Sequence, residues 1–268
     1  MEKMAENLIF ETHAHYDDEA FSEDRYKLLE GMKSWGIGTV MNIGASIESS
    51  RTSLELAEKY PFVYAAVGVH PEYADRMNEE ILAELETLAQ NKKVVAIGEI
   101  GLDYHYPEPD PEVQRIWFRR QMELAVRRDL PVVIHSREAA ADTLNILKEF
   151  SGWKREFKGS MHCYSYSAEI AKEVIKMGYH IGIGGVITFN NARKLVEALE
   201  VIPMDRVLLE TDCPYMAPTP HRGERNFSGY LPLVAKKIAE LKGITEEEVI
   251  HITRENAEAV FGPFGGNA

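Results

Sequence analysis

The sequence of 268 residues contains only two cysteines, no long apolar run and a shortage of positive charge. Two thiols, Cys163 and Cys213, do not make a disulfide framework in a chain of this length, so we expect a reducing, cytoplasmic location. No apolar run approaches the roughly 18 residues that a transmembrane helix needs. The first residues lead into no apolar signal core, so export is not expected either.

The charge balance disfavours large anionic partners. Lys and Arg number 30 against 43 Asp and Glu, which gives a formal net charge of −13. Taken alone, this charge ranks duplex DNA and anionic membranes low as partners. The remaining composition, 45% hydrophobic and 27% charged, is typical of globular proteins and excludes disorder and fibrous repeats. No linker or low-complexity tract divides the chain, and we expect a single domain over residues 1–268.

Short apolar runs alternate with longer amphipathic ones along the chain. The expected strands are rich in Val and Ile, as buried parallel strands are, and span 8–12, 39–43, 62–69, 94–100, 131–135, 160–162, 179–183 and 206–210. The expected helices span 24–35, 47–59, 78–91, 111–129, 137–150, 167–177, 190–200, 230–242 and 245–261. This alternation predicts an α/β fold, a (β/α)8 TIM barrel, and the alternative is a doubly wound open sheet.

Chemically versatile side chains follow the expected strands, at the barrel end that carries chemistry in this fold. They are His13 and His15 at the first strand, His70 at the third, Glu99 at the fourth, His135 at the fifth, His162 at the sixth and Asp212 just past the eighth. Any one of them alone would be an ordinary structural residue. Because unpaired buried imidazoles and carboxylates are costly, their gathering on one rim predicts a metal site.

The spacing of these residues suggests how they divide between two cations. His13 and His15 are two residues apart, so on an extended strand both side chains point to one face and can reach one metal. Asp212 can ligate the same metal and hold the attacking water. Glu99 has two carboxylate oxygens, enough to bridge two metals, and the histidines of the fifth and sixth strands can complete the second.

The residues beside the expected ligands indicate a site built from loops. The segment 211–226, after the last strand, is long and contains three prolines, and long ordered loops are usually functional. Cys163 and Cys213 each follow an expected ligand. Since adjacent strand residues point to opposite faces, we expect both thiols to pack outward against helices rather than to bind metal.

These motifs together resemble the TatD family of metal-dependent hydrolases, within the wider amidohydrolase-like barrels. The resemblance covers nearly the whole chain, as far as the helix that contains Asn256. It rests on His-Ala-His at 13–15, Gly-Val-His-Pro at 68–71, Gly-Glu-Ile-Gly-Leu-Asp-Tyr at 98–104, Pro-Val-Val-Ile-His-Ser-Arg at 131–137, Met-His-Cys-Tyr-Ser at 161–165, Ile-Gly-Ile-Gly-Gly at 181–185 and Leu-Leu-Glu-Thr-Asp-Cys-Pro-Tyr at 208–215.

The resemblance implies a barrel with a one- or two-metal site that hydrolyses phosphodiesters in DNA, with 3′ to 5′ deoxyribonuclease activity. It places the metal ligands on the six residues His13, His15, Glu99, His135, His162 and Asp212. The sequence departs from the family pattern at Ala14 and Tyr16, where Cys and Leu are commoner. After Asn226 it reads Phe-Ser-Gly where Glu-Pro is common. The second departure lies in the substrate loop and affects the expected substrate preference.

The mechanism that we expect is hydrolysis by a metal-activated hydroxide between two divalent cations. Histidine ligands suit Zn, Mn, Fe or Ni better than Mg, whereas the family resemblance favours Mg. We expect two divalent cations, Mg, Mn or Zn, and the sequence does not decide among them. The expected catalytic residues are Asp212, Glu99 and His70. The expected substrate-binding residues are Asp103, Arg137, Arg222 and Arg225.

Two other functions remain open at this point. The same dinuclear site could hydrolyse a different ester, an amide or a lactone, because the pocket and not the metal decides the substrate. The chain could also be a non-catalytic metal-binding scaffold, although a scaffold needs no such set of ligands.

The net negative charge of the chain limits the forms of DNA that we expect it to bind. Two dications bring +4, against −2 from two carboxylates and −1 from a hydroxide, which leaves the centre near +1 while the rest of the surface stays acidic. We therefore expect DNA to bind as short single strands or chain ends rather than as wrapped duplex. No membrane association is expected, and the sequence identifies no stable protein partner.

Overall fold

The computed structural model describes residues 7–156 and 158–262. The strands are β1 (Ile9–Ala14), β2 (Ile37–Ile43), β3 (Val63–Val67), β4 (Val94–Asp103), β5 (Val132–Arg137), β6 (Gly159–Met161), β7 (Tyr179–Ile183) and β8 (Val207–Leu209). The helices are α1 (Arg25–Gly31), α2 (Ile47–Lys59), α3 (Glu79–Leu88), α4 (Pro111–Arg128), α5 (Ala140–Glu149), α6 (Ala168–Lys176), α7 (Arg193–Val201), α8 (Leu231–Lys242) and α9 (Glu246–Phe261).

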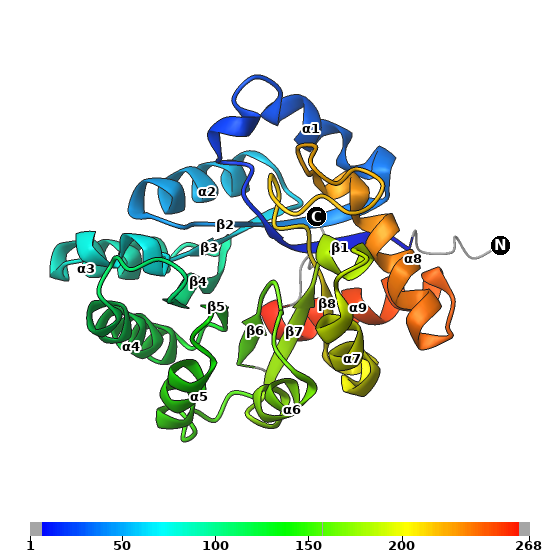
Figure 1. The fold of residues 1–268 in the computed structure, drawn as a ribbon. Coiled ribbons are helices and arrows are strands. Elements are labelled where there is room, and N and C mark those ends of the chain that lie inside the picture. The colour runs from blue at the N-terminus through cyan, green and yellow to red at the C-terminus, as the bar shows by residue number, and fades with distance from the viewer. Residues whose placement is uncertain (1–6, 157, 263–268) are drawn as a thin grey trace.

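The strands form one parallel sheet in the order β1 to β8, and the helices surround it (Figure 1). The two edges meet just beyond β8, where the amide of Asp212 donates to the carbonyl of His13 at 2.9 Å. The amide of His15 likewise donates to the carbonyl of Cys213 at 2.9 Å. The sequential strand order and this closure confirm the predicted barrel and exclude the doubly wound sheet.

Burial explains why the strands read as unbroken apolar runs. Every residue of β4 is buried, as are all residues of the short strands β6 and β8. Helices cover the outside of the barrel, and their ends carry the capping residues that the sequence provides. Ser46 accepts a hydrogen bond from the amide of Ser49 at the start of α2, and Thr245 and Glu248 form a capping box at the start of α9.

Two strand boundaries differ from the prediction and change where the site residues stand. β4 runs to Asp103 rather than to residue 100, and β5 runs to Arg137 rather than to residue 135. The extension arises because the two strands, after a register shift between Ile97 and Ile100, stay paired up to Asp103 and Arg137. Glu99 and His135 therefore lie within strands, not at their ends. Other boundaries shift by a few residues, and β3 stops two residues early, at Val67.

No helix among residues 7–156 and 158–262 is both long and apolar enough to cross a membrane.

Candidate metal centre

A pocket of about 670 Å³ opens at the carboxyl ends of the strands. Five of the six expected ligands line it, and the sixth, His13, lies fully buried beneath it. The six side chains come from β1, β4, β5 and the segments that directly follow β1, β6 and β8. The barrel thus brings together residues that are up to 199 positions apart in the sequence, as its closed strand order requires.

One set of ligand atoms converges from the β1 and β8 side. The Nε2 atoms of His13 and His15 lie 3.1 Å apart, and Asp212 Oδ1 lies 3.7 Å from the first and 3.5 Å from the second. Glu99 Oε2 lies 3.5 and 3.7 Å from the same two nitrogens. Ligand atoms about 2.1 Å from a tetrahedral cation are about 3.4 Å apart, so the atoms of His13, His15 and Asp212 match the size of one cation site, and Glu99 Oε2 lies beside them.

The hydrogen bonding of His15 explains why a positive charge belongs between these atoms. Its Nδ1 donates to the carbonyl of Ile43 at 2.9 Å, which turns the Nε2 lone pair into the site. That lone pair faces Nε2 of His13, and two imidazole nitrogens at 3.1 Å need a proton or a cation between them. The Nδ1 of His13 is buried without a hydrogen-bond partner, so nothing on the protein side fixes its proton.

The pKa values of His13 and His15 also indicate that a positive charge is favoured between the two imidazoles. Burial lowers the pKa of His13 to about 4. Burial also acts to lower the pKa of His15, but hydrogen bonding to Asp212 and the charge of Glu99 raise it to about 10. Without metal, the site therefore holds a proton on His15, in the place where a cation would bind.

A second set of atoms converges from the β4, β5 and β6 side. Glu99 Oε1 lies 2.6 Å from His162 Nε2 and 2.8 Å from His135 Nδ1, and these two nitrogens are 3.1 Å apart. The other nitrogen of His135 bonds to Asp103 Oδ2 at 2.9 Å. A carboxylate behind an imidazole is the usual support for a metal-ligating histidine. The imidazole of His70 lies next to this set, with Nε2 3.6 Å from Glu99 Oε1.

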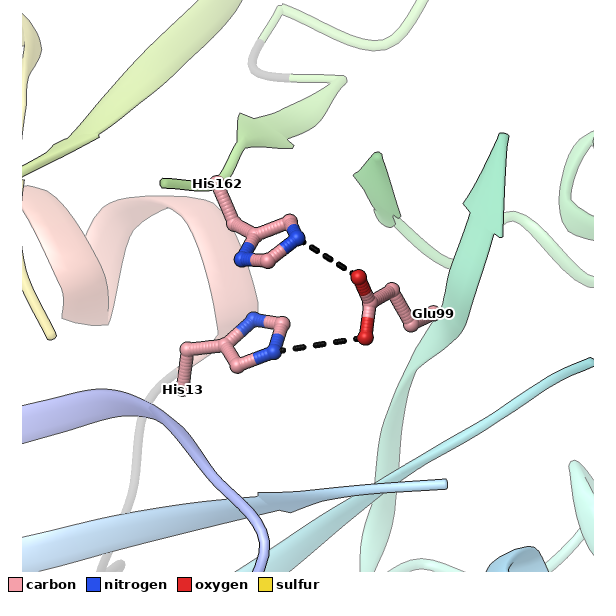
Figure 2. A group of neighbouring side chains, drawn as sticks. All are labelled: His13, Glu99 and His162. Atoms are coloured by element: carbon pink, nitrogen blue, oxygen red, sulfur yellow. Dashed lines mark ion pairs between the residues drawn. The ribbon is translucent and has the colours of Figure 1, made fainter. Parts of the chain in front are cut away.

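Glu99 connects the two sets, because each of its oxygens faces a different one. Figure 2 shows one oxygen directed at His13 and the other at His162. Burial acts to raise the pKa of Glu99, but the charge of His162 and the hydrogen bonds from His13 and His135 hold it well below the usual range. An ionised carboxylate in this position can share its two oxygens between two cations.

Both sets belong to a chain with clear relatives. A family model described as TatD related DNase matches residues 10–262. The chain belongs to this family. The uncharacterized metal-dependent hydrolase YabD of Bacillus subtilis (strain 168) is 42% identical over 254 residues, covering 95% of this chain and 99% of the relative. The 3′-5′ ssDNA/RNA exonuclease TatD of Erwinia tasmaniensis is 32% identical over 260 residues, covering 94% and 99%.

A solved structure supports the same assignment. The crystal structure of YJJV, a TatD homolog from Escherichia coli K12, is similar with a TM-score of 0.89 and 32% identity, covering 96% of this chain and 98% of that one. The family membership that the motifs predicted is therefore confirmed. This chain is a metal-dependent hydrolase of the TatD family.

Left-handed backbone directs two residues of the hydrolase into the pocket. Asp212 has φ of 58°, a conformation that Asp tolerates better than most residues, and its carboxylate faces the histidines of β1. Cys163 has φ of 43° and lines the pocket. The expectation that Cys163 packs outward is thus wrong, because strand alternation ends at Met161. Cys213 is fully buried in the apolar core.

The four expected substrate residues are placed very differently. Arg137 is exposed at the pocket rim, and Asp103 lines the pocket while holding His135. Arg225 lies outside the pocket lining, where its guanidinium forms two hydrogen bonds to the carboxylate of Asp24, at 2.6 and 2.8 Å. Arg222 also lies outside the lining, over the ring of Phe189. The structure therefore brings only the first two toward the candidate ligands.

Four buried amide side chains position the loops around the site, and sequence reasoning missed all of them. In each case the amide bonds to the backbone of a loop that carries a site residue. Asn42 accepts from the amide of Tyr16, Gln121 bonds both backbone groups of Val69, Gln114 bonds both of Asp103, and Asn226 donates to the carbonyls of Thr211 and Tyr215. Neutral amides fix backbone without adding charge beside a metal. Their sequence signal is absent, since a buried Gln reads like an exposed one.

Glu11 is a further missed residue beneath the site. It is fully buried, and its carboxylate accepts hydrogen bonds from the amides of His13 and Thr211 and from the hydroxyl of Thr211, at 2.7 to 3.1 Å. These bonds connect β1 to the segment after β8, which carries Asp212. The one available signal was its position, two residues before His13 and on the same face of the strand.

Proposed function

We propose that this hydrolase is a deoxyribonuclease that removes nucleotides from the ends of short single-stranded DNA, in the 3′ to 5′ direction, with two divalent cations. The observation that carries the proposal is the position of Glu99, whose Oε2 faces His13 and His15 while its Oε1 faces His135 and His162. Bridged pairs of cations recur in enzymes that cleave phosphodiesters. The exonuclease name of the Erwinia relative favours nucleic acid as the substrate.

The donor set fits divalent cations with mixed nitrogen and oxygen preference. Four imidazoles and two carboxylates suit Zn or Mn, and Mg would rely on the two carboxylates and water. When bound, the cations would lower the pKa of a water molecule and polarise a phosphoryl oxygen. The proposed ligands are His13, His15 and Asp212 on one side, His135 and His162 on the other, and Glu99 between the sides.

Asp212 is the proposed acceptor of the proton of the attacking water. Burial acts to raise its pKa, but a hydrogen bond to His15 and the charge of His162 lower it. The carboxylate is therefore ionised at neutral pH. It reaches the pocket with a side-chain exposure of 15%, so one oxygen can accept a proton while the other faces the histidines.

His70 is the proposed hydrogen-bond donor to the phosphoryl group. Its Nδ1 accepts a hydrogen bond from the amide of Glu72 at 3.1 Å, so the proton of the neutral ring resides on Nε2. Burial lowers the pKa of His70 to about 3, which keeps the ring neutral. Nε2 thus donates into the pocket rather than ligating a metal. Arg137, at the rim, is the proposed contact to a phosphate.

End-labelled oligonucleotides test the proposed function directly. Single-stranded DNA, duplex DNA and single-stranded RNA are incubated with metal-free protein plus Mg, Mn or Zn, and with EDTA as control. We expect stepwise shortening of single-stranded DNA from its 3′ end and none with EDTA. Absence of cleavage with every metal would contradict the proposal, and a parallel panel of carboxylic esters, lactones and amides would reveal the alternative hydrolase.

A further inference from the structure

The mouth of the pocket carries an unusual share of the exposed apolar surface. Seven large hydrophobic side chains are exposed among the described residues, and three of them line this pocket. They are Tyr106, Tyr215 and Met216, with 50%, 54% and 47% of their surface exposed. Single exposed hydrophobic residues need no explanation, but three around one pocket that also holds candidate metal ligands indicate a surface for a ligand.

The two tyrosines stand on opposite sides of the mouth. Tyr106 lies in the loop after β4, and Tyr215 lies in the loop after β8. In a closed sheet with the strand order β1 to β8, β4 and β8 are four positions apart and so face each other across the barrel. Glu99 is buried and lines the same pocket as both tyrosines.

Both loops are held in place although their apolar tips stay exposed. The buried amide of Asn226 donates to the carbonyl of Tyr215, and the hydroxyl of Tyr215 donates to Asp18 at 3.1 Å. Met216 has φ of 56°, an unfavourable conformation for its residue type, and gains no burial in return. Such local cost at a pocket is typical of functional surfaces.

The loop of Tyr106 is fixed in a comparable way. The side chain of Gln114 donates to the carbonyls of Asp103 and Pro109, which bracket this loop. The guanidinium of Arg137 lies 5.6 Å from the centroid of the Tyr106 ring. An aromatic face next to a cation matches a nucleotide, which offers a base for the ring and a phosphate for the guanidinium.

The formal charges of the rim show where the phosphates of a substrate would run. Asp17, Asp18 and Glu72 line the mouth after β1 and β3, whereas Arg137 lines it at the end of β5. Phosphates are repelled from the acidic side and attracted to the Arg137 side. This arrangement leaves room for one charged strand along one side of the mouth and disfavours a duplex.

We infer that Tyr106, Tyr215 and Met216 form a base-stacking subsite that holds the terminal nucleoside while the adjoining phosphodiester lies at the candidate ligands. The inference rests on the proposed function and adds the substrate feature that is recognised, the planar face of a base. Because every base has such a face, the subsite selects nucleosides over bare phosphodiesters without selecting a base sequence.

The test compares natural oligonucleotides with abasic ones. Five-nucleotide single strands carry either a normal base or a tetrahydrofuran abasic residue at the 3′ end, with matching strands modified at the 5′ end. Cleavage is measured with wild type, Tyr106→Ala and Tyr215→Ala. Tyr106→Phe and Tyr215→Phe retain the ring face, and Tyr26→Ala removes an equally exposed tyrosine, at 49%, from α1, outside the pocket lining.

We expect wild type to cleave the base-bearing end with a kcat/KM about tenfold above that of the abasic end, mainly through KM. Each Tyr→Ala variant should lose most of this preference and cleave the abasic strand as wild type does. The Phe variants and Tyr26→Ala should retain it. Wild type that cleaves both strands equally would overturn the stacking subsite and leave the nuclease function intact. Wild type that cleaves no oligonucleotide would overturn both.

A binding measurement gives a readout that does not depend on turnover. A strand with 2-aminopurine at the terminal position loses fluorescence when that base stacks on an aromatic ring. With Mn²⁺ present and a non-hydrolysable linkage at the terminal phosphodiester to prevent cleavage, we expect quenching by wild type and by the Phe variants, and at least a severalfold weaker response with the Ala variants. Equal quenching by wild type and both Ala variants would overturn the inference.

Discussion

The proposed ligands on the β1 and β8 side of the barrel and those on the β4, β5 and β6 side are held by different kinds of contact. On the first side, backbone hydrogen bonds close the barrel between His13 and Asp212, and the carboxylate of Glu11 ties the same segments together. On the second side, His135 is oriented by the side chain of Asp103. The first half of the proposed centre is therefore held mainly by backbone contacts that close the barrel, whereas the second half depends on the side chain of Asp103, which mutation can remove.

The distances between the proposed ligand atoms also differ between the two halves. The atoms of His13, His15 and Asp212 in the first half are 3.1 to 3.7 Å apart, close to the separation that a bound cation imposes. Those of the second half are 2.6 to 3.1 Å apart and hydrogen-bond to one another. We therefore expect the first half to bind a cation without rearrangement, and the second to open by a few tenths of an ångström.

The largest effect should come from the residue that both halves share. Glu99→Gln removes the negative charge between the two proposed cation sites and preserves the shape of the side chain, so the protein should fold normally. The rate of hydrolysis should fall at least about 1,000-fold, more than the 10- to 100-fold loss that is typical when a residue that only supports a metal ligand is replaced. Oligonucleotide cleavage and circular dichroism check this result. Glu149→Gln, which only breaks a surface pair with Arg119, is the matched control. Turnover of Glu99→Gln within tenfold of wild type would refute the bridging role.

A smaller effect, on the affinity for metal, should distinguish the two halves of the proposed centre. Asp103→Ala removes the support of His135, so affinity for the second equivalent of Mn²⁺ should fall about 10- to 100-fold while the first equivalent binds as before. Calorimetric titration of metal-free protein measures both steps. Asp142→Ala, whose carboxylate bonds to Tyr104 and Arg115 at the surface, should leave both steps unchanged. Equal weakening of both steps by Asp103→Ala would contradict the division of the centre.

The buried carboxylate of the first half should make stability depend on pH. Burial raises the pKa of Glu11 from 4.5 to about 7 in the folded, metal-free protein. Between pH 4.5 and 7 the folded state keeps the proton of Glu11, whereas the unfolded state has released it. The contribution of Glu11 to the free energy of unfolding is therefore complete below pH 4.5 and is lost as the pH rises through 7. We expect Glu11→Gln to flatten the decline in unfolding free energy from pH 5 to 8 by up to about 3 kcal/mol. Parallel curves for wild type and variant, from urea denaturation in EDTA, would show that Glu11 is ionised when folded.

The smallest effect concerns an arginine outside both halves. Arg225 uses its guanidinium to bond Asp24 and the carbonyl of Ala20, at the surface. Arg225→Ala should cost no more than about 1 kcal/mol of stability, as exposed ion pairs do, and change kcat/KM less than twofold. Arg137→Ala, by contrast, should raise KM severalfold for oligonucleotides. A larger increase in KM for Arg225→Ala than for Arg137→Ala would show that Arg225 binds the substrate.

The sequence predicted the barrel and the meeting of the ligands because both follow from a repeated pattern. Strand periodicity places His13 and His15 on one face, and parallel order brings every strand end to one rim. The contact between Asp103 and His135 depends on how far β4 stays paired with β5, which no local pattern reveals. The pairing of Arg225 with Asp24 joins residues 201 positions apart, and only the folded chain shows it.

Local backbone geometry limited the prediction in another way. The alternation rule assumes an extended chain, and the rule fails at Cys163, where φ is positive. The exposure of Tyr215 follows from the course of the loop and from Asn226 beneath it, not from residue type. Features set by repeating geometry were therefore predictable, whereas those set by single turns and long-range contacts were not.

The central claim is that Glu99 lies between two cation sites, and crystals grown with Mn²⁺ test it most directly. Anomalous scattering from manganese should show two peaks roughly 3.5–4 Å apart. One peak should lie among His13, His15 and Asp212, and the other beside His135 and His162, with the Glu99 carboxylate between them. A single peak at saturating Mn²⁺, or two peaks that do not share Glu99, would contradict the account.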